Sequence, residues 1–97
     1  EPISSVCRAV DDFFDKSRFA EINMYRNWCG HSIGVGVHEY PMLDTSADRL
    51  LEPGMVFAIE PYIFEEGSGS LGIEQNFVVT ESGFRILSTG YDELIRL

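Results

Sequence analysis

The sequence predicts an α+β fold in which one or two helices pack on an antiparallel sheet. Apolar residues recur at steps of three and four over the first 16 residues, which is the period of an amphipathic helix. From residue 31 onward the apolar segments are rich in β-branched residues and separated by glycine-containing turns, which favours strands and hairpins. A chain of 97 residues without internal repeats is expected to form one domain.

A helix is expected from about Ser4 to Lys16. Pro2 suits a first helical turn, and Ser4 and Ser5 are candidate caps. The aspartates of this segment lie away from its apolar positions, and we interpret them as a solvated face rather than a metal site. Residues 17–30 keep some helical spacing and predict a short helix or turn. The apolar face of the first helix contains Ile3, Val6, Cys7, Val10, Phe13 and Phe14.

The remaining chain predicts strands joined by loops. Residues 31–38 combine three β-branched residues with closely spaced glycines, which indicates a strand with close backbone approach or a bulge. The other expected elements are a polar loop over 41–54, a strand from Met55 to Phe64, a turn at 67–70, a strand from Leu71 to Thr80, a turn at 81–83, a hairpin strand from Phe84 to Leu87 and a short helical turn from Tyr91 to Leu97.

The composition excludes several classes of partner. The net charge is −9, so neither nucleic acid nor an anionic membrane surface is an expected partner. No apolar run approaches the ~20 residues of a membrane helix, and no signal peptide is recognisable. The first residue is Glu1, so we expect the chain to be cut from a longer one. Cys7 and Cys29 are too few for a disulfide scaffold, and they predict buried free thiols and a cytoplasmic protein.

Two glutamates interrupt apolar strands. Glu60 follows Ile59 in the first long strand, and Glu74 lies between apolar residues in the second. If those strand faces point inward, the two carboxylates need a cation, an arginine or protons. Residues 55–80 contain no Lys, Arg or His, which favours a metal ion, with His31 as the nitrogen ligand. The alternative is that both glutamates face solvent on a one-sided sheet.

His31 and His38 lie seven residues apart, a spacing that does not place two side chains on one face of a regular strand. Gly34 and Gly36 lie between them and could bend the chain enough to change that. A structural histidine is the alternative interpretation.

Five motifs occur in a specific order: GHSIG at 30–34, VHEYP at 37–41, LEPGMVFAIEP at 51–61, GIE at 72–74 and VVTESG at 78–83. This order resembles the C-terminal half of the pita-bread metallopeptidases, which include methionine aminopeptidase, aminopeptidase P, prolidase and creatinase. The resemblance covers roughly residues 22–90, and the HEYP segment is most similar to the aminopeptidase P and prolidase branch. It implies half of a pita-bread fold with a curved antiparallel sheet.

The resemblance also implies roles for four side chains. The family holds two divalent ions with two Asp, one His and two Glu, and His31, Glu60 and Glu74 match the last three. His38 matches a histidine that contacts the substrate carbonyl. A hydroxide that bridges the ions would be the nucleophile, with Glu60 as proton shuttle. Oxygen ligands with one imidazole suit manganese, cobalt, iron or zinc.

The chain also departs from the family pattern. The two aspartate ligands lie upstream in the family, and we do not assign them to the aspartates of the first helix, so the chain holds three ligands of five. Four positions carry other residues than is common in the family, which leaves room for another substrate class: Ser32, Tyr62, Gly72 and Gln75.

We therefore expect residues 1–97 to be the C-terminal portion of the catalytic domain of an Xaa-Pro aminopeptidase or dipeptidase, inactive by itself. The substrate would be a peptide or small molecule. The alternatives are a non-catalytic module that binds a peptide or protein, and a creatinase-type hydrolase of another C–N bond. An unpaired strand edge and apolar face beside His31–Val37 would favour a homo-oligomer.

Overall fold

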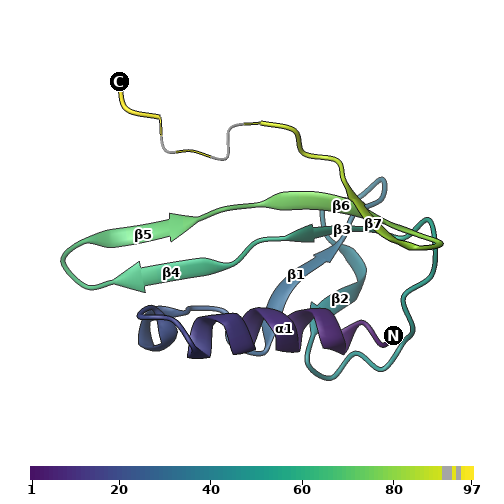
Figure 1. Ribbon diagram of the computed structural model, residues 1–97, viewed down its shortest axis with the longest axis horizontal. Coiled ribbons are helices and arrows are strands. Elements are labelled where there is room, and N and C mark those ends of the chain that lie inside the picture. Colours follow the sequence, from purple (N-terminus) through teal and green to yellow (C-terminus); the bar gives the residue numbers. More distant parts are fainter. Residues whose placement is uncertain (91–92, 94) are drawn as a thin grey trace.

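The computed structural model describes residues 1–90, 93 and 95–97. Over these residues, one long helix is followed by a single 3₁₀ turn and seven strands, which confirms the α+β class. Figure 1 shows how the helix and the strands are arranged. The elements are α1 (Ser4–Asp15), η1 (Ala20–Ile22), β1 (Trp28–Ser32), β2 (Glu39–Asp44), β3 (Val56–Ile59), β4 (Tyr62–Glu65), β5 (Gly69–Gly72), β6 (Gln75–Thr80) and β7 (Gly83–Ile86). The helical turn expected over Tyr91–Leu97 falls on a segment that lies partly outside this description.

Five strands form one antiparallel sheet in the order β2-β1-β3-β6-β7, and β4 pairs with β5 in a separate ribbon. Helix α1 packs against one face of the sheet, and the ribbon extends beyond the end of the sheet (Figure 1). The core between the helix and the sheet consists of Ile3, Cys7, Cys29, Leu43, Phe57, Phe77 and Val79.

The two long strands expected from the sequence are each interrupted at the same level. In the sheet Ile59 is opposite Gln75, and in the ribbon Tyr62 is opposite Gly72, so the two hairpin arms keep one register throughout. Pro61 lies in the interruption and has no amide hydrogen to donate to a neighbouring strand. The expectation of unbroken strands over 55–64 and 71–80 is therefore wrong, and Glu60 and Glu74 fall in the gap between the paired segments.

The chain around the two histidines also differs from the prediction. β1 begins three residues earlier than expected and ends at Ser32, and residues 33–38 form a loop instead of a strand. The loop folds over Glu39, the first residue of β2, whose carboxylate accepts a hydrogen bond from the Gly36 amide at 2.6 Å. The chain then returns beside β1 as β2, so residues 41–44 of the expected loop are a strand, and only residues 45–54 lack strand structure.

Helix α1 starts where it was expected and ends at Asp15, but its first turn is not capped by serine. The N-cap residue is Ile3, and no side chain caps it. The amides of Ile3 and Ser4 instead donate to the carbonyl oxygens of Arg49 and Ala47, at 2.8 and 3.0 Å. The loop over 45–54 therefore satisfies the amides that a serine would otherwise bind.

The aspartates of α1 are not simply solvated. Asp11 accepts a hydrogen bond from the Asn27 amide at 3.1 Å, and Asp15 forms an ion pair with Arg26. Both contacts hold the turn that leads directly into β1, where Asn27 adopts a positive φ of 68°. The helix thus fixes the start of the strand that carries His31.

β1 is an inner strand, with β2 on one side and β3 on the other. An unpaired strand edge was expected beside His31–Val37, and this expectation is wrong for His31 and Ser32, which belong to β1. Val35 and Val37 of that segment are exposed, as expected, and a further apolar surface lines a groove of about 920 Å³ between α1 and the strands β3, β6 and β7. Phe13 and Phe84 line it and are mostly exposed. The expected self-association stays a prediction.

Among the described residues, no helix is long and apolar enough to cross a membrane.

Candidate metal centre

Strand β1 places His31 in the interior of the sheet. A side chain at Gly30 would overlap the carbonyl oxygen of Ala58, so glycine allows β1 to approach β3 closely at this level. His31 is opposite Ala58 in the register of the two strands and is only 3% exposed. The small Ala58 side chain leaves room for the imidazole on this face of the sheet.

The hydrogen bonds of His31 fix the orientation of its ring. Nδ1 lies 3.0 Å from the Ser32 carbonyl oxygen, which can only accept, so Nδ1 carries the proton. Nε2 lies 3.1 Å from Oε1 of Glu60. The lone pair of Nε2 and the carboxylate therefore face each other, an arrangement that needs either a shared proton or a cation between them.

Glu60 directly follows β3 and is held by its backbone as well as by its side chain. Its amide donates to the Cys29 carbonyl oxygen at 2.9 Å, which continues the pairing of β1 with β3. Its side chain is 29% exposed, so the carboxylate is directed at His31 but is still accessible. Two of the three ligand residues predicted from the sequence, His31 and Glu60, thus lie next to each other here.

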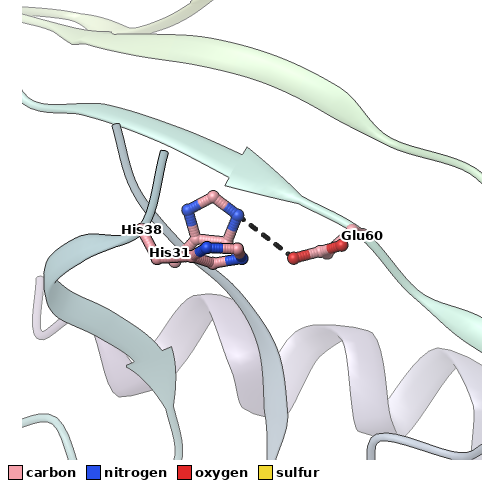
Figure 2. Close-up of side chains that lie close together, drawn as sticks. All are labelled: His31, His38 and Glu60. Atoms are coloured by element: carbon pink, nitrogen blue, oxygen red, sulfur yellow. Dashed lines mark ion pairs between the residues drawn. The ribbon is translucent and has the colours of Figure 1, made fainter. Parts of the chain in front are cut away.

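His38 joins this pair from the loop. Its ring centroid lies 4.2 Å from that of His31, although the side chain is exposed. Ligand atoms of His31, His38 and Glu60 all lie within 4.8 Å of one another, and Figure 2 shows the three side chains converging. The bend that the sequence allowed at Gly34 and Gly36 has brought the histidines together.

Glu74 lies outside this group. It is exposed and is not among the ligand atoms that lie within 4.8 Å of one another in the described residues. Continuing the register of β3 with β6 by one residue places Glu74 opposite Glu60. The expected convergence of three ligands therefore holds for His31 and Glu60, while Glu74 occupies the neighbouring position without joining them.

A row of aromatic rings that sequence reasoning missed leads away from His31. The Trp28 indole is nearly parallel to the imidazole, with 6.5 Å between the ring centroids. The ring centroids of Tyr25 and Trp28 are 5.0 Å apart, and those of Tyr62 and Tyr25 are 5.7 Å apart. The position of Trp28, three residues before His31, was visible in the sequence. The approach of Tyr25 to Tyr62 depends on pairing between the segments around Asn23 and Ile63, for which the sequence carries no signal.

The thiols of Cys7 and Cys29 are buried in the core between the helix and the sheet, and both cysteines are free, as the sequence predicted. Burial, reinforced by the adjacent Cys7, raises the pKa of the Cys29 thiol well above its ordinary value. Burial also raises the pKa of Cys7. Neutral thiols are poor nucleophiles and poor metal ligands, so these cysteines act as core residues.

The donor set fits a divalent metal ion. An imidazole with one nitrogen bound to a backbone carbonyl and the other directed at a carboxylate is the usual form of a histidine ligand with its supporting contact. Nitrogen and oxygen donors together suit zinc, cobalt, iron or manganese. The arrangement can hold a metal ion near an accessible carboxylate and a second imidazole, which are groups that move protons and polarise carbonyls.

The profile of metallopeptidase family M24 matches residues 2–81. An Xaa-Pro dipeptidase of Lactobacillus helveticus is 41% identical over 85 residues, which are 88% of this chain and 22% of that protein. A dipeptidase structure from Pyrococcus horikoshii matches with a TM-score of 0.89 at 32% identity, covering 99% of this chain and 26% of that one. An Xaa-Pro dipeptidase structure from Bacillus anthracis matches with a TM-score of 0.88 at 31% identity, covering all of this chain and 27% of that one. The chain thus spans about a quarter of the length of these proteins.

Proposed function

This chain belongs to metallopeptidase family M24 and adopts half of the pita-bread fold, and from that premise we propose that it supplies one side of the metal centre of an Xaa-Pro dipeptidase or aminopeptidase. The observation that carries the proposal is the buried His31, with Nδ1 bonded to a carbonyl and Nε2 directed at Glu60. The names of the relatives from Lactobacillus helveticus and Bacillus anthracis support the Xaa-Pro substrate class.

Each side chain of the site has a role in this proposal. Nε2 of His31 and the carboxylates of Glu60 and Glu74 would hold two divalent ions, which when bound would activate water and polarise the scissile carbonyl. Glu60 also moves a proton from the attacking water to the leaving amine, for which its partial exposure is suited. His38, exposed beside His31, holds the substrate carbonyl oxygen.

The proposal includes a contribution from outside these residues. Three ligands seldom hold two ions, so two aspartates would come from an upstream half of the catalytic domain. This agrees with the chain spanning about a quarter of its relatives. Residues 1–97 alone are then expected to be inactive as a peptidase, whether the metal is manganese, cobalt, zinc or iron.

A second candidate is hydrolysis of another C–N bond, as in creatinase. The observation that favours it is the pair formed by Tyr62 and Gly72, which are opposite each other in the ribbon. A Cβ atom at Gly72 would lie 2.6 Å from the Tyr62 ring, so the tyrosine fills space that a side chain at position 72 would need. Tyr62 lies two residues after Glu60 and Gly72 two residues before Glu74, so a difference at this pair favours a different substrate shape.

A chimera tests the proposal. The 85 aligned residues of the Lactobacillus helveticus enzyme are replaced by the corresponding residues of this chain, so that the upstream part is supplied by a relative. We expect the chimera to hydrolyse an Xaa-Pro dipeptide when supplied with manganese, and the 97-residue chain to show no hydrolysis. The matched control is Glu60→Gln in the chimera, which should lower kcat at least about 100-fold because the proton shuttle is lost.

Circular dichroism and metal content establish that each chimera folds and binds its ions. A folded, metal-loaded chimera that cleaves creatine but no Xaa-Pro dipeptide would favour the second candidate. One that cleaves neither would indicate a non-catalytic module that binds a peptide or protein.

A further inference from the structure

We propose that Ser32 and Glu39 are positioning residues for His38. Together they close the loop over 33–38, so that the imidazole of His38 lies against the ring of His31. The inference rests on the proposed function in taking His38 as the contact of the substrate carbonyl oxygen. It adds two residues that are neither ligands nor substrate contacts in that proposal.

His38 depends on its loop for its position. The side chain is exposed, and its ring lies against the His31 ring with 4.2 Å between the centroids, as Figure 2 shows. Ordering an exposed side chain on a loop costs conformational entropy. A group that must meet a substrate carbonyl oxygen therefore needs a loop that is held in one shape before the substrate arrives.

Ser32 joins the two ends of this loop. The pairing of β1 with β2 is irregular beyond His31, where Tyr40 and Pro41 have no partner in β1. The Ser32 hydroxyl donates to the Pro41 carbonyl oxygen at 2.8 Å and so links the two strands across the irregularity. Because Ser32 is only 8% exposed, water has little access to replace this hydrogen bond.

The carboxylate of Glu39 fills the inside of the loop. It accepts a hydrogen bond from the Gly36 amide at 2.6 Å, and the Gly34 amide donates to the Gly36 carbonyl oxygen at 3.3 Å. A Cβ atom at Gly34 would overlap the Glu39 carboxylate, so the backbone is packed directly against it. Hydrogen bonds to a carboxylate are stronger than those between neutral groups. Since His38 directly precedes Glu39, this contact fixes the backbone that carries the imidazole.

The start of the loop is attached to a third strand. The Ile33 amide donates to the Val56 carbonyl oxygen at 3.0 Å, where β3 begins. The loop is therefore held at its start by backbone, in its middle by Glu39 and across its ends by Ser32. Ser32 is one of the positions that depart from the common family pattern, and a residue without a hydroxyl could not form its hydrogen bond.

Nuclear magnetic resonance of the metal-free 97-residue chain tests the position of His38. The chain contains two histidines, so a nuclear Overhauser effect between two imidazole rings can come only from His31 and His38. We expect this signal in the unmodified chain and its loss in Ser32→Ala and in Glu39→Ala.

Two variants outside the loop are the matched controls, and both should keep the signal. Ser17→Ala removes a hydroxyl that donates to the Phe14 carbonyl oxygen, also at 2.8 Å, just beyond the end of α1. Glu66→Ala removes an exposed carboxylate from the turn between β4 and β5.

Kinetics of the chimera test the consequence for the reaction. Ser32→Ala and Glu39→Ala should each lower kcat at least about tenfold and change KM less than about threefold, because the lost contact is strongest in the transition state. In a chimera that already carries His38→Ala, the same changes should lower kcat less than about threefold. A purely structural role would give the same loss with and without His38.

The remaining outcomes separate this inference from the proposed function. A ring-to-ring signal that is absent from the unmodified chain, or that persists in both folded variants, overturns the positioning role and leaves the proposed function standing. Equal losses of kcat with and without His38 overturn it too. A folded, metal-loaded chimera that cleaves no Xaa-Pro dipeptide overturns the proposed function, and the magnetic resonance comparison then decides the positioning role. If circular dichroism shows that a variant is unfolded, Gly34→Ala, which displaces the Glu39 carboxylate, takes its place and should lose the signal.

Discussion

Glu60 and Glu74 are opposite each other in one register, yet their surroundings differ. The Glu60 amide is bonded to the Cys29 carbonyl oxygen and its carboxylate faces His31. Glu74 is exposed, and the next two residues carry buried oxygens, Gln75 Oε1 and Asn76 Oδ1, with no hydrogen-bond partner in the described part of the chain. Buried oxygens are usually satisfied, so the Glu74 side has the character of a surface that another segment covers.

The difference follows from the neighbours of the two strands. β3 lies between β1 and β6, so Glu60 has a strand on each side at its level. β7 pairs with β6 only over Phe77–Thr80, beyond which the described strands leave Glu74 without a second neighbour. The register of β3 and β6 decides which residues are opposite each other. A further neighbouring strand is needed to hold the carboxylate in one orientation, and among the described strands only Glu60 has one.

The largest effect should come from disrupting the Glu60 side at Gly30. In Gly30→Ala the new methyl group would overlap the Ala58 carbonyl oxygen, and two backbones must separate to accommodate it. We expect a loss of about 3 kcal/mol in the free energy of unfolding, measured by urea denaturation. Gly90→Ala is the control, because a Cβ atom there meets open space. Equal stabilities of the two variants would show that β1 and β3 are not in close contact.

A smaller effect is expected on the ribbon beyond Glu74. Gly72→Ala places a methyl group 2.6 Å from the Tyr62 ring, which can move more easily than a backbone. The expected loss is about 1–2 kcal/mol. In a Tyr62→Ala background the same change should cost almost nothing, so a double-mutant cycle should give a coupling energy of at least about 0.5 kcal/mol. Strict additivity would contradict the contact.

The smallest effect concerns the two buried thiols of the core, Cys7 and Cys29. Burial raises the pKa of Cys29 and Cys7, so their stabilising contribution is complete below the pKa of an unfolded cysteine, about 8.5, and is lost as the pH rises above it. We expect the free energy of unfolding to fall by about 1 kcal/mol for each pH unit above that value. The control is the double variant Cys7→Ala and Cys29→Ala, which keeps the other titrating groups. If both proteins lose stability equally between pH 8 and pH 10, the thiols are not responsible.

Much of this architecture could be predicted from sequence because it depends on local patterns. The helical period defined α1, and the apolar strand interrupted by Glu60 indicated where chemistry would lie. β2 was missed because Glu39 and the proline at position 41 do not have the pattern of a strand. That segment is a strand because it pairs with β1, which is a tertiary effect.

The site was predictable in its residue types and less so in its grouping. The family resemblance grouped Glu60 and Glu74 in one site, and neither it nor the alternation of side chains along a strand could show that only Glu60 has β1 beside it. The approach of His38 depends on a loop closed by Glu39, a contact between a side chain and a backbone amide that has no periodic signal. The role of Asp11 in holding Asn27 was missed because it links positions distant in sequence.

The stacking of Trp28 on His31 has an optical consequence. The chain contains one tryptophan, and the centroid of its ring lies 6.5 Å from that of the His31 imidazole, with the two rings nearly parallel. Fluorescence from this chain therefore originates, apart from the weaker tyrosines, at a single place beside the candidate ligand. Quenching or enhancement of that emission when an ion binds would follow the state of the site in real time, without any label attached to the protein.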